Sequence, residues 1–420
     1  MTAGPQQSAK VHVDDGIART SAEKPLMSAL RWLPLAVVGA IAIALVERAI
    51  HGAWPFWMED FDVQRMAAAA ALHGDALYHA PEPRTGLFYT HTPFAALLFI
   101  PFALVPATLA GIAWYAVEAL FLELAVWIML GVVGVRRAGR RAGLTLGITL
   151  GALLLDPIDY DLRLGQPHLM LMVLVLADFV YGAGRRWHGV GIGLAAGVKL
   201  VPLIFILYLL LTRRIRAAIT AAGTFLLTVA VGFAFLPGDS VEYFGRGTAL
   251  NLPRIGLPQL PFDQSLRGVL ARLGLTGSPV SPVWLVTALL VVAAGLLIAV
   301  RLYQAGERTW AVLACGLTSV LVSPVSWEHY WVWVLPIMIM LGAQAVRHRS
   351  VFPAVLVVLL AAAFGPRWLH WFAPVDAAIE LRLNPLQQLA AAVFPLAGLI
   401  LLLVLAITVR RRRLGAPRPG

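Results

Sequence analysis

Long apolar runs recur along most of this 420-residue chain, and they constrain its fold more than any other feature. Many are about 15–25 residues long, the length that a helix needs to cross the hydrocarbon core of a bilayer. Their apolar residues are continuous rather than alternating, so the pattern argues against a membrane β-barrel. Charged residues make up 13% of the chain, too few to cover the surface of a soluble protein of this size. The sequence therefore predicts an all-α polytopic membrane protein.

Short arginine clusters separate the apolar runs and predict the orientation of the protein. They lie at residues 136–141, 185–186, 213–216, 301–308, 347–349 and 410–413. Few acidic residues share these segments, and basic loops of membrane proteins stay in the cytoplasm. We therefore expect a plasma-membrane protein with both termini cytoplasmic. The clusters also account for the net charge of +11, so the expected partner is the lipid bilayer and not nucleic acid.

Two apolar segments decide the number of membrane passages. The run at 93–106 has about fourteen residues, which is short for a span, and we interpret it as an interfacial helix. The run at 189–212 has basic clusters at both ends, so we divide it into two short helices that meet at Lys199, just before Pro202. Twelve spans result, near 31–50, 107–135, 143–156, 168–184, 189–199, 201–212, 217–236, 283–300, 309–323, 329–345, 351–365 and 386–408.

These spans form a single transmembrane domain over residues 31–408. We expect a disordered cytoplasmic tail at 1–30 and a basic cytoplasmic tail at 409–420. The loops at 51–106 and 237–282 are then extracytoplasmic. Both are long, and long loops in a compact fold usually carry function.

Acidic residues gather at the start of the first outer loop, where Glu59, Asp60 and Asp62 precede a short amphipathic helix over 62–73. Helix capping explains one of them, because the first turn of a helix favours acids. A carboxylate at the edge of the membrane is unfavourable unless it has a function. We therefore treat the cluster as a candidate site.

Other polar residues fall on the same predicted face. A tight outer turn at 156–168 separates two spans, a second turn has the sequence SPVSWEHY, and a third group lies in the second long loop. These segments and the helix break supply further candidate site residues: Arg163, Gln166, His168, Lys199, Arg267, Glu328 and His329.

Carboxylates among cations and imidazoles favour group transfer from a lipid-bound anion. A carboxylate can accept the proton of a sugar hydroxyl as that hydroxyl attacks an anomeric carbon. The negative charge of a departing lipid phosphate can be stabilised by Lys199, Arg163, Arg267 or His329. No His/Asp/Glu spacing is typical of a metal site, and the only cysteine, Cys315, lies in an apolar run. We therefore expect no metal and no cofactor.

Six stretches resemble, in order, the motifs of one family. They are EDFDVQRMAAAAALHGDALYHA, FYTHTPFAALLFIPFALVP, LGQPHLMLMVLVL, GLAAGVKLVPLIF, QSLRGVLARL and SPVSWEHYWVWVLP. The sequence resembles glycosyltransferase family 87, within the C-type membrane glycosyltransferase (GT-C) superfamily. Each match is short, but six in register from about residue 55 to 340 are specific for that family.

The resemblance implies a GT-C fold and an inverting, metal-independent mannosyltransferase. The donor would be polyprenyl-phosphate mannose, and the acceptor a glycolipid such as phosphatidylinositol mannoside, joined through an α-1,2 linkage on the outer face. It further implies that Asp60 is the general base and His329 a donor-site residue. The remaining substrate-binding candidates are Lys199, Gln166, His168, Arg163, Arg267, Glu328, Tyr89 and His91.

This chain departs from the family motifs at three places, which affects the identity of the acceptor. Gln64 replaces a tyrosine, His91 and Thr92 stand where the motif has its first proline, and His168 replaces an asparagine. The alternatives are the same chemistry on lipomannan or with an arabinofuranosyl donor, and, in a different class, a lipid-linked sugar flippase or transporter. Transporters usually contain repeats and mid-membrane charges. Here we find no repeat, and most polar residues lie at one face.

Overall fold

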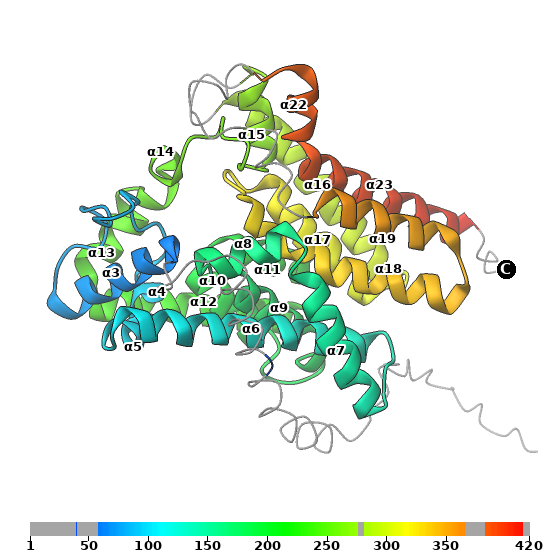
Figure 1. The fold of residues 1–420 in the computed structure, drawn as a ribbon, viewed down its shortest axis with the longest axis horizontal. Coiled ribbons are helices and arrows are strands. Elements are labelled where there is room, and N and C mark those ends of the chain that lie inside the picture. Colours follow the sequence, from blue (N-terminus) through cyan, green and yellow to red (C-terminus); the bar gives the residue numbers. More distant parts are fainter. Residues whose placement is uncertain (1–38, 40–57, 276–280, 366–382, 415–420) are drawn as a thin grey trace, which may run out of the picture.

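The structure is a computed structural model that describes residue 39 and residues 58–275, 281–365 and 383–414 (Figure 1). Within these ranges the chain is helical, and its only β-structure is two isolated bridges, Pro81 with Phe88 and Asp263 with Trp327. The all-α prediction is confirmed for these residues. The N-terminal tail, the span predicted at 31–50 and the last residues of the basic tail lie outside them.

Three short helices form the described part of the first outer loop: α3 (Glu59–His73), α4 (Pro93–Leu98) and α5 (Ile100–Ala103). Helix α3 begins three residues earlier than predicted, and its N-cap is Met58, which makes no side-chain capping bond. Helix α4 begins at a proline, and the Thr92 hydroxyl caps it by accepting from the Ala95 N–H at 3.2 Å. The interfacial helix predicted at 93–106 is therefore a pair of short helices, α4 and α5.

Helices make up most of the rest of the chain. The first group is α6 (Ala107–Val132), α7 (Ala138–Ala152), α8 (Asp156–Leu164), α9 (His168–Tyr181), α10 (Val190–Val198), η1 (Val201–Leu203), α11 (Ile204–Leu211) and α12 (Ile215–Phe235). The second outer loop holds α13 (Pro237–Ser240), η2 (Val241–Gly245), η3 (Thr248–Leu250), α14 (Leu252–Ile255) and α15 (Leu266–Arg272). The last group is α16 (Pro282–Gln304), α17 (Arg308–Val322), η4 (Glu328–Trp333), α18 (Val334–His348), α19 (Val351–Ala363), α22 (Pro385–Ala390) and α23 (Val393–Leu414).

Five of the described helices are long and apolar enough to cross a membrane, or six if the bent pair α7 and α8 counts as one span. The five are α6, α12, α16, the continuous η4–α18 segment and α23. Four shorter apolar helices, α9, η1–α11, α17 and α19, accompany them. Each span predicted beyond residue 100 is helical, which confirms a polytopic helical protein. The number of twelve passages stays a prediction.

The prediction of a tight outer turn at 156–168 is wrong, because helix α8 occupies most of this segment. This nine-residue helix bends by 83° from α7. Pro157 in its first turn and the acids Asp156 and Asp159 beside it favour a new helix start. Gly165, with φ of 72°, ends the helix in the left-handed conformation. Helix α8 therefore places its polar side chains on a rigid element.

The break predicted at Lys199 is confirmed. Lys199 has extended backbone angles, φ −147° and ψ 133°, between α10 and η1, and Pro202 lacks the N–H that a continuous helix would need. Helix α10 packs closely on α12, since a Cβ on Gly193 would lie 2.5 Å from the Ala221 carbonyl oxygen. Small residues allow helices in membranes to approach in this way. The break thus lies within a tightly packed part of the protein.

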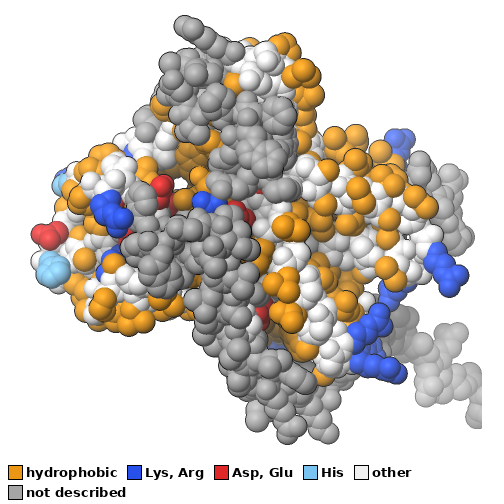
Figure 2. Space-filling model, in the orientation of Figure 1, with side chains coloured by type: hydrophobic (Ala, Val, Ile, Leu, Met, Phe, Trp, Pro, Cys, Tyr) orange, Lys and Arg blue, Asp and Glu red, His pale blue; other side chains and the backbone are white. Residues whose placement is uncertain are grey.

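Several exposed basic side chains lie at one end of the molecule. Figure 2 shows them at the end where Figure 1 places the α6–α7 and α18–α19 connections and the C-terminus, although a few basic side chains also lie at the opposite end. Arg136 and Arg137 belong to the first connection and Arg140 to the first turn of α7, whereas Arg347 is in the last turn of α18 and Arg349 in the second connection. The outer-loop helices α3 and α4 lie at the opposite end of α6 in Figure 1. This separation agrees with the orientation expected from the basic clusters.

The orientation predicts which introduced cysteines react from outside the cell. Asp75→Cys and Gln259→Cys lie in the two outer loops, so a membrane-impermeant thiol reagent should label both in intact cells. Arg140→Cys, at the start of α7, should react only after permeabilisation. The native Cys315 is buried and should contribute little background. Labelling of Arg140→Cys in intact cells, with protection of the other two, would reverse the predicted topology.

Candidate active site

Asp60, the second residue of α3, is held against α8. Its Oδ2 accepts a hydrogen bond of 2.8 Å from Gln166 Nε2, and Gln166 directly follows the glycine that ends α8. That glycine permits the approach, because a Cβ on Gly165 would lie 2.6 Å from the Cβ of Phe61. Burial raises the pKa of the Asp60 carboxyl from 3.8 to about 6, although the bond from Gln166 and the charge of Lys199 oppose the rise. A carboxylate with this pKa suits a base that works near neutral pH.

The other two acids of the cluster have different surroundings. Glu59 is exposed. Asp62 is paired with Arg84 at 3.4 Å and with Arg65 at 4.0 Å. All three stand in the first turn of α3, where they interact favourably with the helix dipole. Only Asp60 is bonded to the residues of α8 and its C-terminal turn.

Lys199 is the cation whose charge acts on Asp60 among the described residues. Its Nζ lies 2.9 Å from His168 Nε2 and 3.8 Å from the centre of the Tyr330 ring. On its other side the His168 ring contacts Asp161, with Nδ1 and Oδ1 2.8 Å apart. Lys199 also interacts electrostatically with Asp60 and Asp161. The helix break, α8, α9 and η4 therefore meet around one ammonium group.

Two further histidines line this site with unused hydrogen-bonding capacity. His329 has a ring centre 5.1 Å from that of His168, and both of its ring nitrogens are buried without a hydrogen-bond partner among the described residues. His91 Nδ1 lies 2.5 Å from Gln64 Nε2, but the buried Nε2 of His91 has no partner among those residues. Lys199 interacts electrostatically with His91 and His329. These nitrogens therefore leave hydrogen-bonding capacity at the site that a polar ligand could use.

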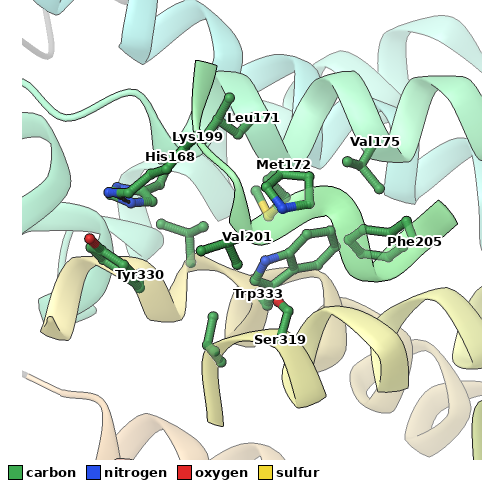
Figure 3. A pocket seen from close by; sticks show the side chains of 13 residues that line it. His168, Leu171, Met172, Val175, Lys199, Val201, Phe205, Ser319, Tyr330 and Trp333 are labelled. Atoms are coloured by element: carbon green, nitrogen blue, oxygen red, sulfur yellow. Dashed lines mark hydrogen bonds between the residues drawn. The ribbon is translucent and has the colours of Figure 1, made fainter. Parts of the chain in front are cut away.

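A small cavity of about 30 Å³ adjoins Lys199 (Figure 3). Figure 3 shows His168, Lys199 and Tyr330 at one end, and Val175, Phe205 and Trp333 toward the other. The remaining walls are almost entirely apolar: Leu171, Met172, Val201, Pro202, Val320 and Val332, with Ser319. The site therefore joins a polar, cationic end to an apolar pocket.

The structure thus brings together six of the residues singled out from the sequence: Asp60, Gln166, His168, Lys199, His329 and His91. The other four are engaged elsewhere or have no described contact with Lys199. Tyr89 is fully buried and donates to the Thr92 carbonyl oxygen at 2.8 Å. Arg163 lies 3.7 Å from Asp159.

Arg267 donates to the Pro324 carbonyl oxygen at 3.3 Å, in the turn that leads to η4. Glu328 is fully buried at the start of η4, next to His329. Arg267 therefore holds the turn that precedes His329, and Glu328 belongs to that turn. Their direct role in binding, like those of Tyr89 and Arg163, stays a prediction.

Two residues of the site were not selected from the sequence. Asp161 was visible as one of several acids before His168, but only the helical form of α8 places its carboxylate on that ring. Tyr330 follows His329 directly, and it contributes its ring face to Lys199. The sequence pattern contained no signal for either contact.

Among the described residues, no group of three or more His, Cys, Asp or Glu side chains is arranged to hold a metal ion. The expectation that the protein needs no metal stays a prediction. The chemistry available from the described side chains is a carboxylate base, an ammonium group and several neutral imidazoles. This set suits proton transfer together with the binding of an anion.

Comparison with known proteins gives a consistent result. The sequence model of glycosyltransferase family 87 matches residues 89–324, a range that includes Lys199 but ends before His329 and begins after Asp60. The chain is 33% identical over 401 residues to a polyprenol-phosphate-mannose-dependent alpha-(1-2)-phosphatidylinositol mannoside mannosyltransferase of Mycobacterium tuberculosis, covering 91% of this chain and 92% of that protein.

Two further relatives have similar names. A protein of Mycolicibacterium smegmatis with the same name is 35% identical over 318 residues, or 70% of this chain and 71% of that protein. A polyprenol-phosphate-mannose-dependent alpha-(1-2)-phosphatidylinositol pentamannoside mannosyltransferase of Mycobacterium tuberculosis is 32% identical over 295 residues, or 69% of this chain and 67% of that protein.

Proposed function

This chain belongs to glycosyltransferase family 87, and on that premise we propose that it transfers mannose from polyprenyl-phosphate mannose to a phosphatidylinositol mannoside. The new linkage is α-1,2, and the reaction takes place on the outer face of the plasma membrane. The observation that carries the proposal is the interaction of Asp60 with Lys199, which lines the polar end of an apolar cavity. We also propose that the protein has the GT-C fold, with twelve membrane spans and both termini in the cytoplasm.

In the proposed reaction, Asp60 accepts the proton of an acceptor hydroxyl. The hydroxyl oxygen attacks the anomeric carbon of the mannose, and the bond from that carbon to the phosphate oxygen breaks. The electron pair leaves on polyprenyl phosphate, so the configuration at the anomeric carbon is inverted in one displacement. Gln166 supports this step by holding Asp60 through its 2.8 Å hydrogen bond. An ionised Asp60 is the form that can act as a base.

The donor site is proposed around Lys199. Its ammonium group would stabilise the negative charge that develops on the leaving phosphate. The free ring nitrogens of His329 and His91 are available to the sugar hydroxyls or phosphate oxygens. The apolar walls of the adjoining cavity, such as Phe205 and Trp333, suit the first isoprene units of the lipid. A lipid-linked anionic sugar therefore matches both ends of the site.

The direct test is a transfer assay with the purified full chain in detergent. Polyprenyl-phosphate mannose is incubated with phosphatidylinositol mannosides of different mannose content, including a pentamannoside, and with lipomannan, and the products are identified by mass spectrometry. We expect a phosphatidylinositol mannoside to gain one hexose that an α-1,2-specific mannosidase removes. Transfer only from an arabinofuranosyl donor, or only to lipomannan, would replace the proposed substrate. Absence of transfer, with translocation of the lipid-linked sugar by the protein reconstituted into vesicles, would favour a flippase.

The raised pKa of Asp60 leads to a prediction for the pH dependence of transfer. The base must be ionised, and its pKa is about 6 rather than 3.8, so kcat/KM for the acceptor should rise with pH and reach half of its plateau near pH 6. Below that midpoint the rate should fall about tenfold per pH unit. A pH–rate profile of the purified protein measures this. An acidic limb with its midpoint near 4 would mean that Asp60 is not the titrating base.

A further inference from the structure

Asp161, His168 and Lys199 form a continuous chain of polar contacts beneath the proposed donor site. Asp161 is fully buried in α8, and His168, the first residue of α9, is 7% exposed. The carboxylate contacts the ring at 2.8 Å, and the ring contacts the ammonium group at 2.9 Å. The second carboxylate oxygen of Asp161 accepts from the Leu169 N–H at 3.3 Å, which anchors it to the start of α9. The carboxylate is therefore held in place independently of the lysine.

These contacts favour one tautomer of His168. An ionised carboxylate only accepts hydrogen bonds, so with Asp161 ionised the ring nitrogen facing it, Nδ1, carries the proton. The opposite nitrogen, Nε2, faces a group that in its charged form only donates. Nε2 must then be an unprotonated acceptor, because two donors would otherwise face each other at 2.9 Å. The neutral ring with its proton on Nδ1 satisfies both contacts at once.

We propose that Asp161 is a positioning residue that acts through His168: it fixes the ring so that Nε2 accepts a hydrogen bond from the Lys199 ammonium group and keeps that group charged and oriented. One N–H of Lys199 is then directed to the ring, and its cationic head rests over the face of Tyr330. The remaining N–H groups are free for an anionic ligand. The inference rests on the proposed function only for the identity of that ligand, a lipid-linked phosphate.

Other ionisable groups also face Lys199, and the test must separate them from Asp161. They are Asp60 of α3, His91 in the segment before α4, and His329 and Tyr330 of η4, while Glu118 of α6 faces Asp161 itself. Removal of any nearby carboxylate would lower the charge on Lys199 through space alone. If Asp161 acts on Lys199 through His168, its effect must disappear when His168 is replaced.

The chain offers a direct probe of Lys199, because its only other lysines are Lys10 and Lys24. Lys199 is partly exposed. Reductive methylation by formaldehyde and a borohydride modifies only the neutral amine. The extent of methylation of the Lys199 peptide is measured by mass spectrometry as a function of pH. Its midpoint reports how strongly the ammonium form is stabilised. Lys10 and Lys24 serve as internal references. The measurement requires no substrate.

We expect Asp161→Asn to lower the midpoint pH for Lys199 methylation by about one unit or more, because an anion that stabilises the ammonium form is lost. His168→Gln should lower it similarly. The double variant should show little further change. Asp159→Asn, two residues away on α8, is the matched control and should leave the midpoint unchanged. If Asp161→Asn lowers the midpoint as much in the His168→Gln background as in the wild type, Asp161 acts through space and not through His168, and the proposal is wrong. An unchanged midpoint in either single variant would also overturn the proposal.

Binding of the donor gives a second measurement. If the proposed transfer activity is found, Asp161→Asn should raise the donor KM about tenfold, with a smaller effect on kcat, whereas Asp159→Asn should change neither. Should Asp161→Asn not fold, His168→Gln alone still tests the contact with Lys199 by methylation. If no transfer occurs with any donor, the proposed function fails, yet the methylation midpoints still decide whether Asp161 acts on Lys199.

Discussion

Asp60→Asn is expected to lower the rate of transfer by about 10²–10⁴, because it removes the proposed base from the reaction. Asparagine has nearly the same shape as aspartate, and its amide oxygen can still accept the hydrogen bond from Gln166. The protein should therefore keep its melting temperature and its affinity for polyprenyl phosphate. Single-turnover transfer with bound donor measures the chemical step separately from binding.

The two neighbouring acids provide matched controls for this variant. Glu59→Gln alters an exposed side chain, and Asp62→Asn breaks contacts with Arg84 and Arg65 without touching the site. Both should retain most of the activity. In Glu59→Gln the acidic limb of the pH profile should move slightly to lower pH, because the Glu59 charge is the smallest of the causes that raise the pKa of Asp60. If Asp62→Asn lost activity while Asp60→Asn kept it, the base would be misassigned. If all three variants stayed active, the proposed mechanism would fail.

The helices and the break at Lys199 could be predicted from the sequence because they depend on local features. Long apolar runs with a basic cluster at one end have few alternatives to a membrane helix. A proline three residues after a lone lysine similarly indicates where such a helix must be interrupted. These features act over a few residues, so their interpretation requires no knowledge of the neighbouring helices.

The contacts within the site could be predicted less well, because they depend on where elements distant in the chain meet. Asp60 and Gln166 are 106 residues apart, and Lys199 and His168 are 31 apart. Helix α8 was missed because nine residues rich in Asp and Arg resemble a polar turn, although Pro157 and Gly165 mark its two ends. Without that helix the sequence offered no reason to prefer Asp161 to its neighbours. Arg163 and Arg267 had suitable charges, but only the fold shows that they contact Asp159 and the Pro324 carbonyl.

Lys199→Met is expected to raise the donor KM and to lower the rate of transfer by about 10²–10³, the loss commonly seen when one group that stabilises developing charge is removed. Methionine keeps an unbranched stem of similar length, so the packing near Tyr330 should be preserved. Lys199→Arg keeps the charge and should retain more of the donor affinity than the methionine variant. Steady-state kinetics with the donor varied, on protein of unchanged melting temperature, compare the three forms.

The same variant should also change the acidic limb of the pH–rate profile. The charge of Lys199 holds the pKa of Asp60 below the value that burial alone would produce. Without that charge the carboxyl binds its proton more tightly, so the midpoint of the limb should move above pH 6 in Lys199→Met and much less in Lys199→Arg. A structural lysine far from the chemistry would leave this midpoint where it is. Unchanged donor kinetics together with an unchanged limb would therefore remove Lys199 from the mechanism, whereas a shifted limb with normal donor binding would make it a partner of Asp60 alone.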